Sequence, residues 1–153
     1  MEKIASFTID HLKLRLGLYV SRKDVRDNVT VTTFDIRITS PNIEPVIDNG
    51  SLHSIEHLAA TYLRNSARKE DIVYFGPMGC RTGCYLLLFG NLESEDVYSL
   101  VIDMCDFIME YQGEIPGASA RECGNYLEQN LQMAKQHIKK YKKELETHKR
   151  FKY

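Results

Sequence analysis

The fold is decided by residues 29–39, which read VTVTTFDIRIT. Apolar and polar side chains alternate in this stretch and β-branched residues are frequent, a pattern typical of a β-strand. Because the side chains of a strand point alternately to its two faces, Phe34, Ile36 and Ile38 should share one face and Asp35 and Arg37 the other. The stretch therefore predicts a strand with an apolar face and a charged pair on the opposite face.

The rest of the chain divides into short strands and long helices. The expected elements are a helix at 51–65, a pair of strands at 72–76 and 84–89, a helix at 94–112, and a last helix from about 119 to 148. Ser94 and Gly113 are the expected caps of the helix at 94–112, and Ser119 with Glu122 forms a capping-box pattern for the last one. This order predicts an α+β fold, an antiparallel sheet layered against long helices, in a single domain over residues 1–153.

Length and composition indicate an ordinary globular protein. The 153 residues are 43% hydrophobic and 27% charged, which is typical of one soluble domain. The longest apolar run, residues 84–89, is far shorter than the roughly 20 residues that span a bilayer. No basic-then-apolar leader opens the sequence. We therefore expect a cytoplasmic protein that does not insert into a membrane.

Charge is distributed unevenly along the chain. Residues 135–153 carry a net charge of +6, and the first 134 residues carry −7. Such a tail can bind nucleic acid or another acidic partner, or it can be a solvated helix end whose cations complement the helix dipole. The few aromatic residues in the tail favour the helix end, and we expect no nucleic-acid partner.

The sharpest chemical motif is His53-Ser54-Ile55-Glu56-His57. At 100° per residue, His53, Glu56 and His57 lie on one face of a helix, while Leu52 and Ile55 lie on the opposite, core-facing side. Two imidazoles at i and i+4 can bind one metal ion with a carboxylate beside it, as in HxxEH metalloenzymes. The alternative is that three polar residues simply occupy a solvated helix face.

A metal site needs a third protein ligand. The candidates are His11, Cys80, Cys84 and Cys123. Cys123 should lie in the first turn of the last helix, where the helix dipole would stabilise its thiolate. Two imidazoles and a thiolate suit zinc or ferrous iron better than magnesium or calcium. The fourth cysteine, Cys105, lies on an apolar helix stripe and is expected in the core.

Cys80 occupies a different environment, the glycine-rich turn Pro77-Met78-Gly79-Cys80-Arg81-Thr82-Gly83. An accessible thiol next to a basic side chain forms a thiolate more readily. Arg37 and Arg81 are both candidates for that cation. A cysteine without a chemical role in a turn is the alternative.

Taken together, these blocks resemble the S-ribosylhomocysteine lyase (LuxS) family over nearly the whole chain. The blocks that carry the resemblance are SFTIDH at 6–11, FDIR at 34–37 followed by Pro41-Asn42, SLHSIEHL at 51–58, PMGCRTG at 77–83, and ECGNY at 122–126. Each block is modest alone, but five in this order and spacing are specific.

The resemblance implies a role for each matching residue. His53, His57 and Cys123 match the metal ligands, with water as the fourth, and Glu56 and Cys80 match the two general acid/base residues. The residues that match the substrate pocket are Ser6, His11 and Arg37, with Asp35 on the same strand face. The metal of this family is ferrous iron, which zinc or cobalt can replace, and no organic cofactor is needed.

The same resemblance implies a reaction and an assembly. Members cleave S-ribosylhomocysteine to homocysteine and 4,5-dihydroxy-2,3-pentanedione, an autoinducer precursor in quorum sensing. They are homodimers with two sites at the subunit interface, so Ser6 and His11 are expected to act on the partner's site.

One position departs from the family pattern. Cys84 stands where an aromatic residue is usual, and we expect it to serve packing, although an oxidative Cys80–Cys84 disulfide would inactivate the enzyme. Two other functions compete with the lyase: an HxxEH metallopeptidase, and a binding module with a structural His/His/Cys metal site.

Overall fold

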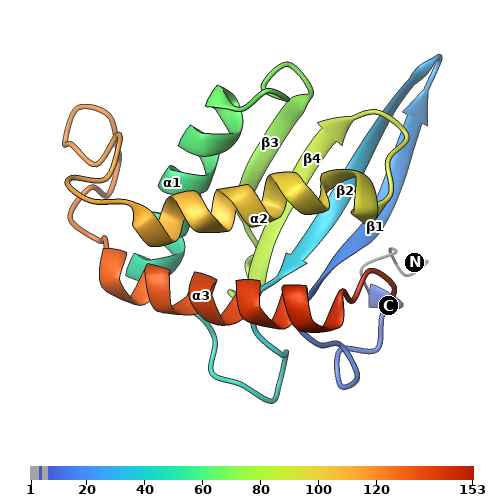
Figure 1. Ribbon diagram of the computed structural model, residues 1–153, viewed down its shortest axis with the longest axis horizontal. Coiled ribbons are helices and arrows are strands. Elements are labelled where there is room, and N and C mark those ends of the chain that lie inside the picture. Colours follow the sequence, from blue (N-terminus) through green and yellow to red (C-terminus); the bar gives the residue numbers. More distant parts are fainter. Residues whose placement is uncertain (1–3, 5–6) are drawn as a thin grey trace.

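One antiparallel sheet forms the centre of the computed structural model, which describes residue 4 and residues 7–153. Its strands are β1 (Gly17–Arg26), β2 (Val29–Arg37), β3 (Ile72–Pro77) and β4 (Gly83–Phe89), in the order β1-β2-β4-β3. The helices are α1 (Asn49–Asn65), α2 (Ser94–Glu110) and α3 (Leu131–His148). The α2 and α3 helices cross one face of the sheet, and α1 lies beside β3 (Figure 1). This is the expected α+β arrangement of an antiparallel sheet against long helices.

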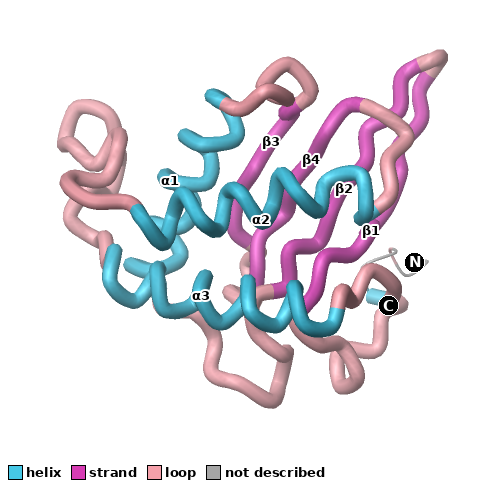
Figure 2. The backbone as a smooth tube through the Cα atoms, in the orientation of Figure 1, coloured by secondary structure: helices cyan, strands magenta, loops and turns pink. Residues whose placement is uncertain are grey.

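The two faces of β2 differ as the sequence predicts. Phe34, Ile36 and Ile38 are fully buried and belong to the core between the sheet and the helices. Asp35 and Arg37 alternate with them and therefore lie on the opposite face, which Figure 2 shows without a helix over it. We call this the open face of the sheet. The strand itself ends at Arg37, two residues earlier than expected.

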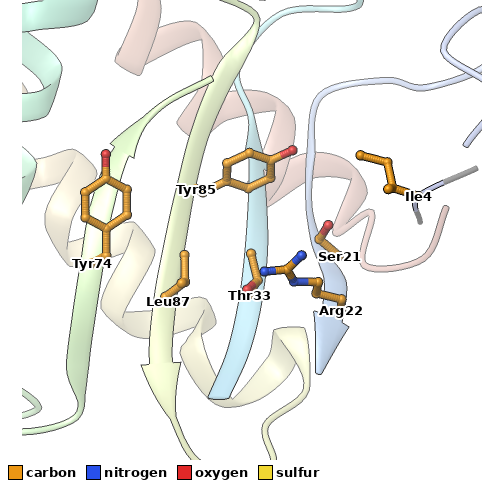
Figure 3. A pocket seen from close by; sticks show the side chains of 7 residues that line it. All are labelled: Ile4, Ser21, Arg22, Thr33, Tyr74, Tyr85 and Leu87. Atoms are coloured by element: carbon orange, nitrogen blue, oxygen red, sulfur yellow. The ribbon is translucent and has the colours of Figure 1, made fainter. Parts of the chain in front are cut away.

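The open face carries a shallow cavity of about 390 Å³. Figure 3 shows side chains from all four strands along it. Its lining consists of Ile4, Ser21, Arg22, Thr33, Tyr74, Tyr85 and Leu87. Tyr74 is 49% exposed, so an aromatic side chain of considerable area faces solvent on this side of the sheet.

The structure adds one strand to the prediction and moves both ends of the α2 helix. Strand β1 was not predicted, because only its first residues face the core and most of its second half is exposed. The α2 helix is capped by Glu93, one residue before Ser94, since Asp96 Oδ2 accepts a hydrogen bond from the Glu93 N–H at 2.8 Å. Its C-cap is Tyr111 in place of Gly113.

The largest correction concerns the last helix, which begins at Leu131 and not near Ser119. The Ser119 hydroxyl does donate to Glu122 at 2.7 Å, and the Cys123 N–H bonds to the Ser119 carbonyl, but this local turn is not continued as helix. The true N-cap is Asn130, whose side chain accepts from the Met133 N–H. Residues 111–130 therefore form a long loop beside α1 (Figure 2).

Basic side chains of the C-terminal segment form ion pairs with acidic side chains of the same chain. Lys142 Nζ lies 2.6 Å from Asp106 on α2, and Arg150 forms an ion pair with Glu144 at 3.3 Å. Lys140 pairs with Glu44. These contacts agree with the interpretation of the basic stretch as a helix end. Among the residues described, no helix is both long and apolar enough to cross a bilayer.

Candidate metal centre and catalytic cysteine

The α1 helix presents the HxxEH motif as the sequence predicts. Asp48 caps its N-terminus by accepting from the Ser51 N–H at 2.9 Å. Leu52 and Ile55 are buried in the core, whereas His53, Glu56 and His57 are half-buried on the other side of the helix. The i, i+4 spacing brings the two imidazole rings to a centroid separation of 4.6 Å.

The loop 111–130 brings Cys123 to these histidines. One ligand atom from each of His53, His57 and Cys123 lies within 4.8 Å of the others, and His53 Nε2 is 3.4 Å from Cys123 Sγ. A tetrahedral zinc ion with ordinary Zn–N and Zn–S bonds places such atoms about 3.6 Å apart. The three side chains are therefore spaced for one metal ion.

Backbone carbonyls fix the orientation of both rings. The Nδ1 of His57 donates to the Pro116 carbonyl at 2.7 Å, and the Nδ1 of His53 donates to the Glu128 carbonyl at 3.0 Å. A carbonyl can only accept, so these two contacts require a proton on each Nδ1 and leave a lone pair on each Nε2. The Gln129 amide nitrogen, 3.2 Å from His53 Nδ1, cannot donate to that nitrogen in the same tautomer. This is the outer-shell arrangement that prepares histidines for a metal. The donor set thus fits a soft-to-borderline divalent ion.

The sequence predicted Cys123 in the first turn of the last helix, and this prediction is wrong because that helix begins at Leu131. This residue lies within the loop, and its sulfur accepts a hydrogen bond from the Asn125 N–H at 3.4 Å. Cys123 still lies in the three-residue cluster, but the loop and not a helix positions it.

Cys80 belongs to a second group, at the turn between β3 and β4. Its Sγ lies 3.1 Å from the Thr82 hydroxyl oxygen, and Arg37 Nη1 lies 3.9 Å from the same sulfur. Arg37 Nη1 also donates to Thr82 Oγ1 at 2.5 Å. The thiol is exposed, so it can meet a substrate.

The pKa of the Cys80 thiol is lowered by this group. Partial burial raises the pKa, but the hydrogen bonds from Thr82 and the positive charge of Arg37 outweigh it. Arg81 is not the cation responsible, because its side chain extends to Asn49 Oδ1 at 3.2 Å. Arg37, and not Arg81, is therefore the cation beside the Cys80 sulfur.

Arg37 is itself held by a buried ion pair with Asp35. Arg37 Nη2 lies 2.5 Å from Asp35 Oδ2, and both side chains are at most 4% exposed. Burial raises the pKa of Asp35, against the lowering effect of Arg37 and of a hydrogen bond from Tyr153. Asp35 Oδ1 and Arg37 Nε have no hydrogen-bond partner within residues 4 and 7–153.

Of the other predicted site residues, the structure places some near these two groups and does not describe others. We call Cys80, Thr82, Arg37, Asp35 and Tyr153, which are joined by hydrogen bonds, the open-face group. The charge of His11 lowers the pKa of Asp35, so His11 lies near this group in its own chain. Ser6 falls outside the described residues. No hydrogen bond between described residues links Cys80 with Glu56.

The other two cysteines are packing residues, as expected. Cys84 and Cys105 are both fully buried and free. Burial raises the pKa of Cys84, and the nearby charges of Glu56 and Asp35 raise it further. Neither thiol is available as a nucleophile at neutral pH.

Sequence reasoning missed two residues of the open-face group. Thr82 stands two positions after Cys80 in a turn, a spacing that could have identified it. Tyr153, whose hydroxyl donates to Asp35 Oδ2 at 3.0 Å, is the last residue of the chain and carries no local signal.

Comparison with known proteins gives a consistent result. The sequence profile of S-ribosylhomocysteinase (LuxS) matches residues 4–152. The S-ribosylhomocysteine lyase of Finegoldia magna is 57% identical over 141 residues, covering 92% of this chain and 90% of that protein. The enzyme of the same name from Phocaeicola vulgatus is 54% identical over 149 residues, covering 97% and 92%. With its metal-ligand geometry and these matches over almost its full length, the chain belongs to the S-ribosylhomocysteinase (LuxS) family.

Proposed function

We propose that this protein is a metal-dependent carbon–sulfur lyase that cleaves S-ribosylhomocysteine to homocysteine and 4,5-dihydroxy-2,3-pentanedione. The observation that carries the proposal is the His53, His57 and Cys123 cluster, with Glu56 on the same helix face, in a chain whose relatives are named S-ribosylhomocysteine lyases. The exposed Cys80 thiol of lowered pKa supplies the second chemical group that the reaction needs.

The reaction explains why two acid/base groups are required. A thioether on an unactivated sugar carbon leaves poorly, so the carbonyl must first move from carbon 1 to carbon 3 of the ribose. Each shift removes a proton beside a carbonyl and returns one to the neighbouring carbon. With the carbonyl at carbon 3, loss of the proton on carbon 4 forms a C4–C5 double bond. The C5–S bond breaks, and the homocysteine thiolate leaves and takes up a proton. The enol left at carbon 4 then loses its hydroxyl proton and gains a proton at carbon 5, which gives the dione.

Cys80 and Glu56 are the proposed carriers of these protons. A general base works best when its pKa lies near the working pH, and the lowered pKa of Cys80 brings the thiol closer to that condition. Glu56 would hold or return a proton from the helix face beside the metal ligands.

The metal ligands proposed are His53, His57 and Cys123. The Nε2 atoms of the two histidines are free to bind because each Nδ1 donates to a carbonyl. A bound divalent metal would act as a Lewis acid toward the sugar oxygens and leave one position for water or substrate. Ferrous iron is the proposed native ion, with zinc or cobalt as substitutes, and no organic cofactor is proposed.

Neither competing function gains support from these observations. A metallopeptidase would use Glu56 on a metal-bound water and would leave the Arg37–Thr82–Cys80 group without a purpose. A structural metal site usually has four protein ligands, whereas the described cluster has three, and a binding module would not require Cys80 to have a lowered pKa.

We also propose that the working enzyme is a homodimer with sites at the interface. The open face of the sheet exposes aromatic side chains and carries the Asp35–Arg37 pair, with His11 nearby. A second copy that covers this face would bring Ser6 and His11 of one subunit to the metal ligands of the other. Because Cys80 and Cys123 must stay reduced, the cytoplasm is the proposed compartment, and autoinducer formation is the proposed use of the product.

Mixing two inactive variants tests the shared site. In mixed dimers of His11→Ala with Glu56→Gln, one site would receive both wild-type residues if they come from different subunits. Random exchange of subunits should then restore about a quarter of the wild-type activity. No recovery in dimers whose exchange is verified by mass would place both residues in one subunit.

The test of the reaction itself is release of homocysteine from S-ribosylhomocysteine, measured as free thiol. Protein purified anaerobically, with its metal counted, should release the thiol in proportion to about one divalent metal per subunit. No release from reduced, metal-loaded protein would contradict the proposal, and peptide hydrolysis would then be measured.

A further inference from the structure

The C-terminal segment after α3 turns back onto the sheet. Lys149 adopts a left-handed conformation with φ 43° and ends the helix. The next residue, Arg150, accepts a backbone hydrogen bond from the Leu18 N–H at 3.0 Å, and its guanidinium donates to the Leu16 carbonyl at 3.2 Å. Figure 1 shows this end of the chain beside β1. The tail is thus attached to the first strand by its backbone and by a side chain.

The last residue, Tyr153, reaches the open-face group. Its ring stacks on Tyr19 of β1, with centroids 4.7 Å apart and planes 15° from parallel. Its hydroxyl donates to Asp35 Oδ2 at 3.0 Å. Burial and the negative charge of Asp35 raise the pKa of Tyr153, so the phenol stays a hydrogen-bond donor at neutral pH.

From Asp35 the contacts continue without a gap to the sulfur of Cys80. The carboxylate oxygen that accepts from Tyr153 also accepts from Arg37 Nη2 at 2.5 Å. The other nitrogen of the same guanidinium, Nη1, donates to Thr82 Oγ1 and lies 3.9 Å from Cys80 Sγ. The terminal hydroxyl therefore helps to fix the carboxylate that orients the arginine beside the thiol.

We propose that Tyr153 is a positioning residue for Cys80, acting through Asp35 and Arg37. The inference rests on the proposed role of Cys80 as a general base. The planar guanidinium forms its two contacts from a fixed fork, so a shift of the Asp35 carboxylate at one side moves Nη1 at the other. Without the Tyr153 hydroxyl, Arg37 is the one donor that the described residues leave on Asp35 Oδ2, and the guanidinium is held less firmly against the sulfur.

Several ionisable groups surround this relay, and all of them except Tyr153 itself are unchanged in the test. The groups whose charges act on Asp35 or are acted on by it are His11, Arg37, Tyr19, Cys84, Tyr85, Tyr141 and Tyr153. The charge that lowers the pKa of Cys80 is that of Arg37, and Tyr85 is raised in pKa by both Asp35 and Cys80. Among the described residues, Arg37 is the cation that contacts both the Asp35 carboxylate and the Cys80 sulfur, so it is the proposed link from Tyr153 to the thiol.

The experiment compares wild-type protein with Tyr153→Phe, which keeps the aromatic stack and removes only the hydroxyl. Full-length, metal-loaded protein is alkylated with iodoacetamide over a range of pH, and modification of Cys80 is followed on its own peptide by mass spectrometry. The expected result is a higher pKa for Cys80 and alkylation about threefold slower at pH 7, the effect of weakening one ordinary hydrogen bond. The acid limb of kcat/KM should move to higher pH by the same amount, with little change in KM.

Lys152→Ala is the matched control, because Lys152 is the exposed neighbour in the same tail. It should alkylate at the wild-type rate. An unchanged or lower pKa of Cys80 in Tyr153→Phe would overturn the inference, even if the enzyme releases homocysteine normally. Conversely, if wild-type protein releases no homocysteine, the proposed function fails while the alkylation comparison still decides the role of Tyr153.

Discussion

At the scale of single residues, the proposed chemistry depends on what lowers the pKa of Cys80. The thiol lies beside a hydrogen-bonding hydroxyl, that of Thr82 at 3.1 Å, and a cation, the Arg37 guanidinium at 3.9 Å. A hydrogen bond to a thiolate favours the charged form, as does a nearby cation. Together they outweigh the cost of partial burial and lower the pKa.

Thr82→Val should shift the pH dependence of turnover. Cys80 can act as the proposed base only in its thiolate form, so the rate should rise with pH as this thiol loses its proton. The pKa of Cys80 lies below that of a free thiol. Removing the hydroxyl raises this pKa, moves the acid limb to higher pH and lowers kcat/KM at pH 7 about fivefold. Thr82→Ser keeps the hydroxyl and should retain the wild-type profile. An identical profile for both variants would remove Thr82 from the assignment.

Substitution of Cys80 and substitution of Cys123 should have different effects on activity and on metal content. Cys80→Ala should abolish homocysteine release while the metal content stays near one per subunit, because Cys80 is not in the ligand cluster. Cys123→Ala should lose the metal, since two imidazoles alone hold a structural or catalytic ion poorly. Metal analysis beside the activity measurement distinguishes the two. Near-normal turnover in the first variant, or full metal loading in the second, would refute the corresponding role.

At the scale of elements, the proposed metal centre is formed by one helix and one loop. The α1 helix carries two of the proposed ligands through its own periodicity, and the loop 111–130 carries Cys123 together with the carbonyls of Pro116 and Glu128. The loop therefore controls both the third ligand and the tautomer of both histidines. Its backbone conformation matters as much as its side chains.

Gly117→Ala should weaken metal binding through this backbone. Gly117 has φ +73°, and an added Cβ would lie 3.3 Å from Nδ1 of His57, next to the Pro116 carbonyl that this nitrogen donates to. Disturbing such an outer-shell bond costs about tenfold or more in metal affinity, which competition with a chelator measures.

Gly113→Ala is the control for backbone strain in the same loop. It also has a positive φ, +99°, but an added Cβ would meet nothing within 4 Å. Its metal affinity should remain close to that of the wild type. Equal weakening in the two variants would mean that strain, and not the contact with His57, is the cause.

At the scale of the whole molecule, one sheet separates the core from the chemistry of the open face. Neighbouring residues of β2 point to opposite faces of the sheet. Ile36 is buried under the helices, whereas Asp35 and Arg37 lie on the open face. The α3 helix packs on the core side of the sheet and is hydrogen-bonded to its first strand. Its Tyr141 is fully buried and donates to the Gly17 carbonyl of β1 at 3.1 Å.

Tyr141→Phe should therefore lower the free energy of unfolding. The substitution keeps the ring in the core and removes the hydrogen bond between α3 and β1, at a cost of about 1 to 2 kcal/mol. Urea unfolding measures this loss. Tyr98→Phe, where the ring packs against Phe151 at a half-buried site, should change the stability by less than about 0.5 kcal/mol. Equal effects in the two variants would contradict the role of the Tyr141 bond.

The sequence by itself determined the local features of this protein. The alternation in residues 29–37 predicted both faces of β2, and the i, i+4 spacing of His53 and His57 predicted their common helix face, because each pattern depends on a few neighbouring residues. The α+β class followed from the order of these elements. The capping-box pattern at Ser119 misled for the same reason, since a local hydrogen bond formed there without a helix to follow it.

Only the tertiary structure decided which distant groups meet. The choice of Arg37 over Arg81 beside Cys80 depends on strand pairing, which places Arg37 opposite Gly83. The carbonyl partners of the histidines come from a loop whose path no periodicity describes. Tyr153 and Asp35 are 118 positions apart in the chain, and their contact exists because the tail docks on β1. Contacts of this kind follow from the packing of the whole chain, and a short stretch of sequence carries no sign of them.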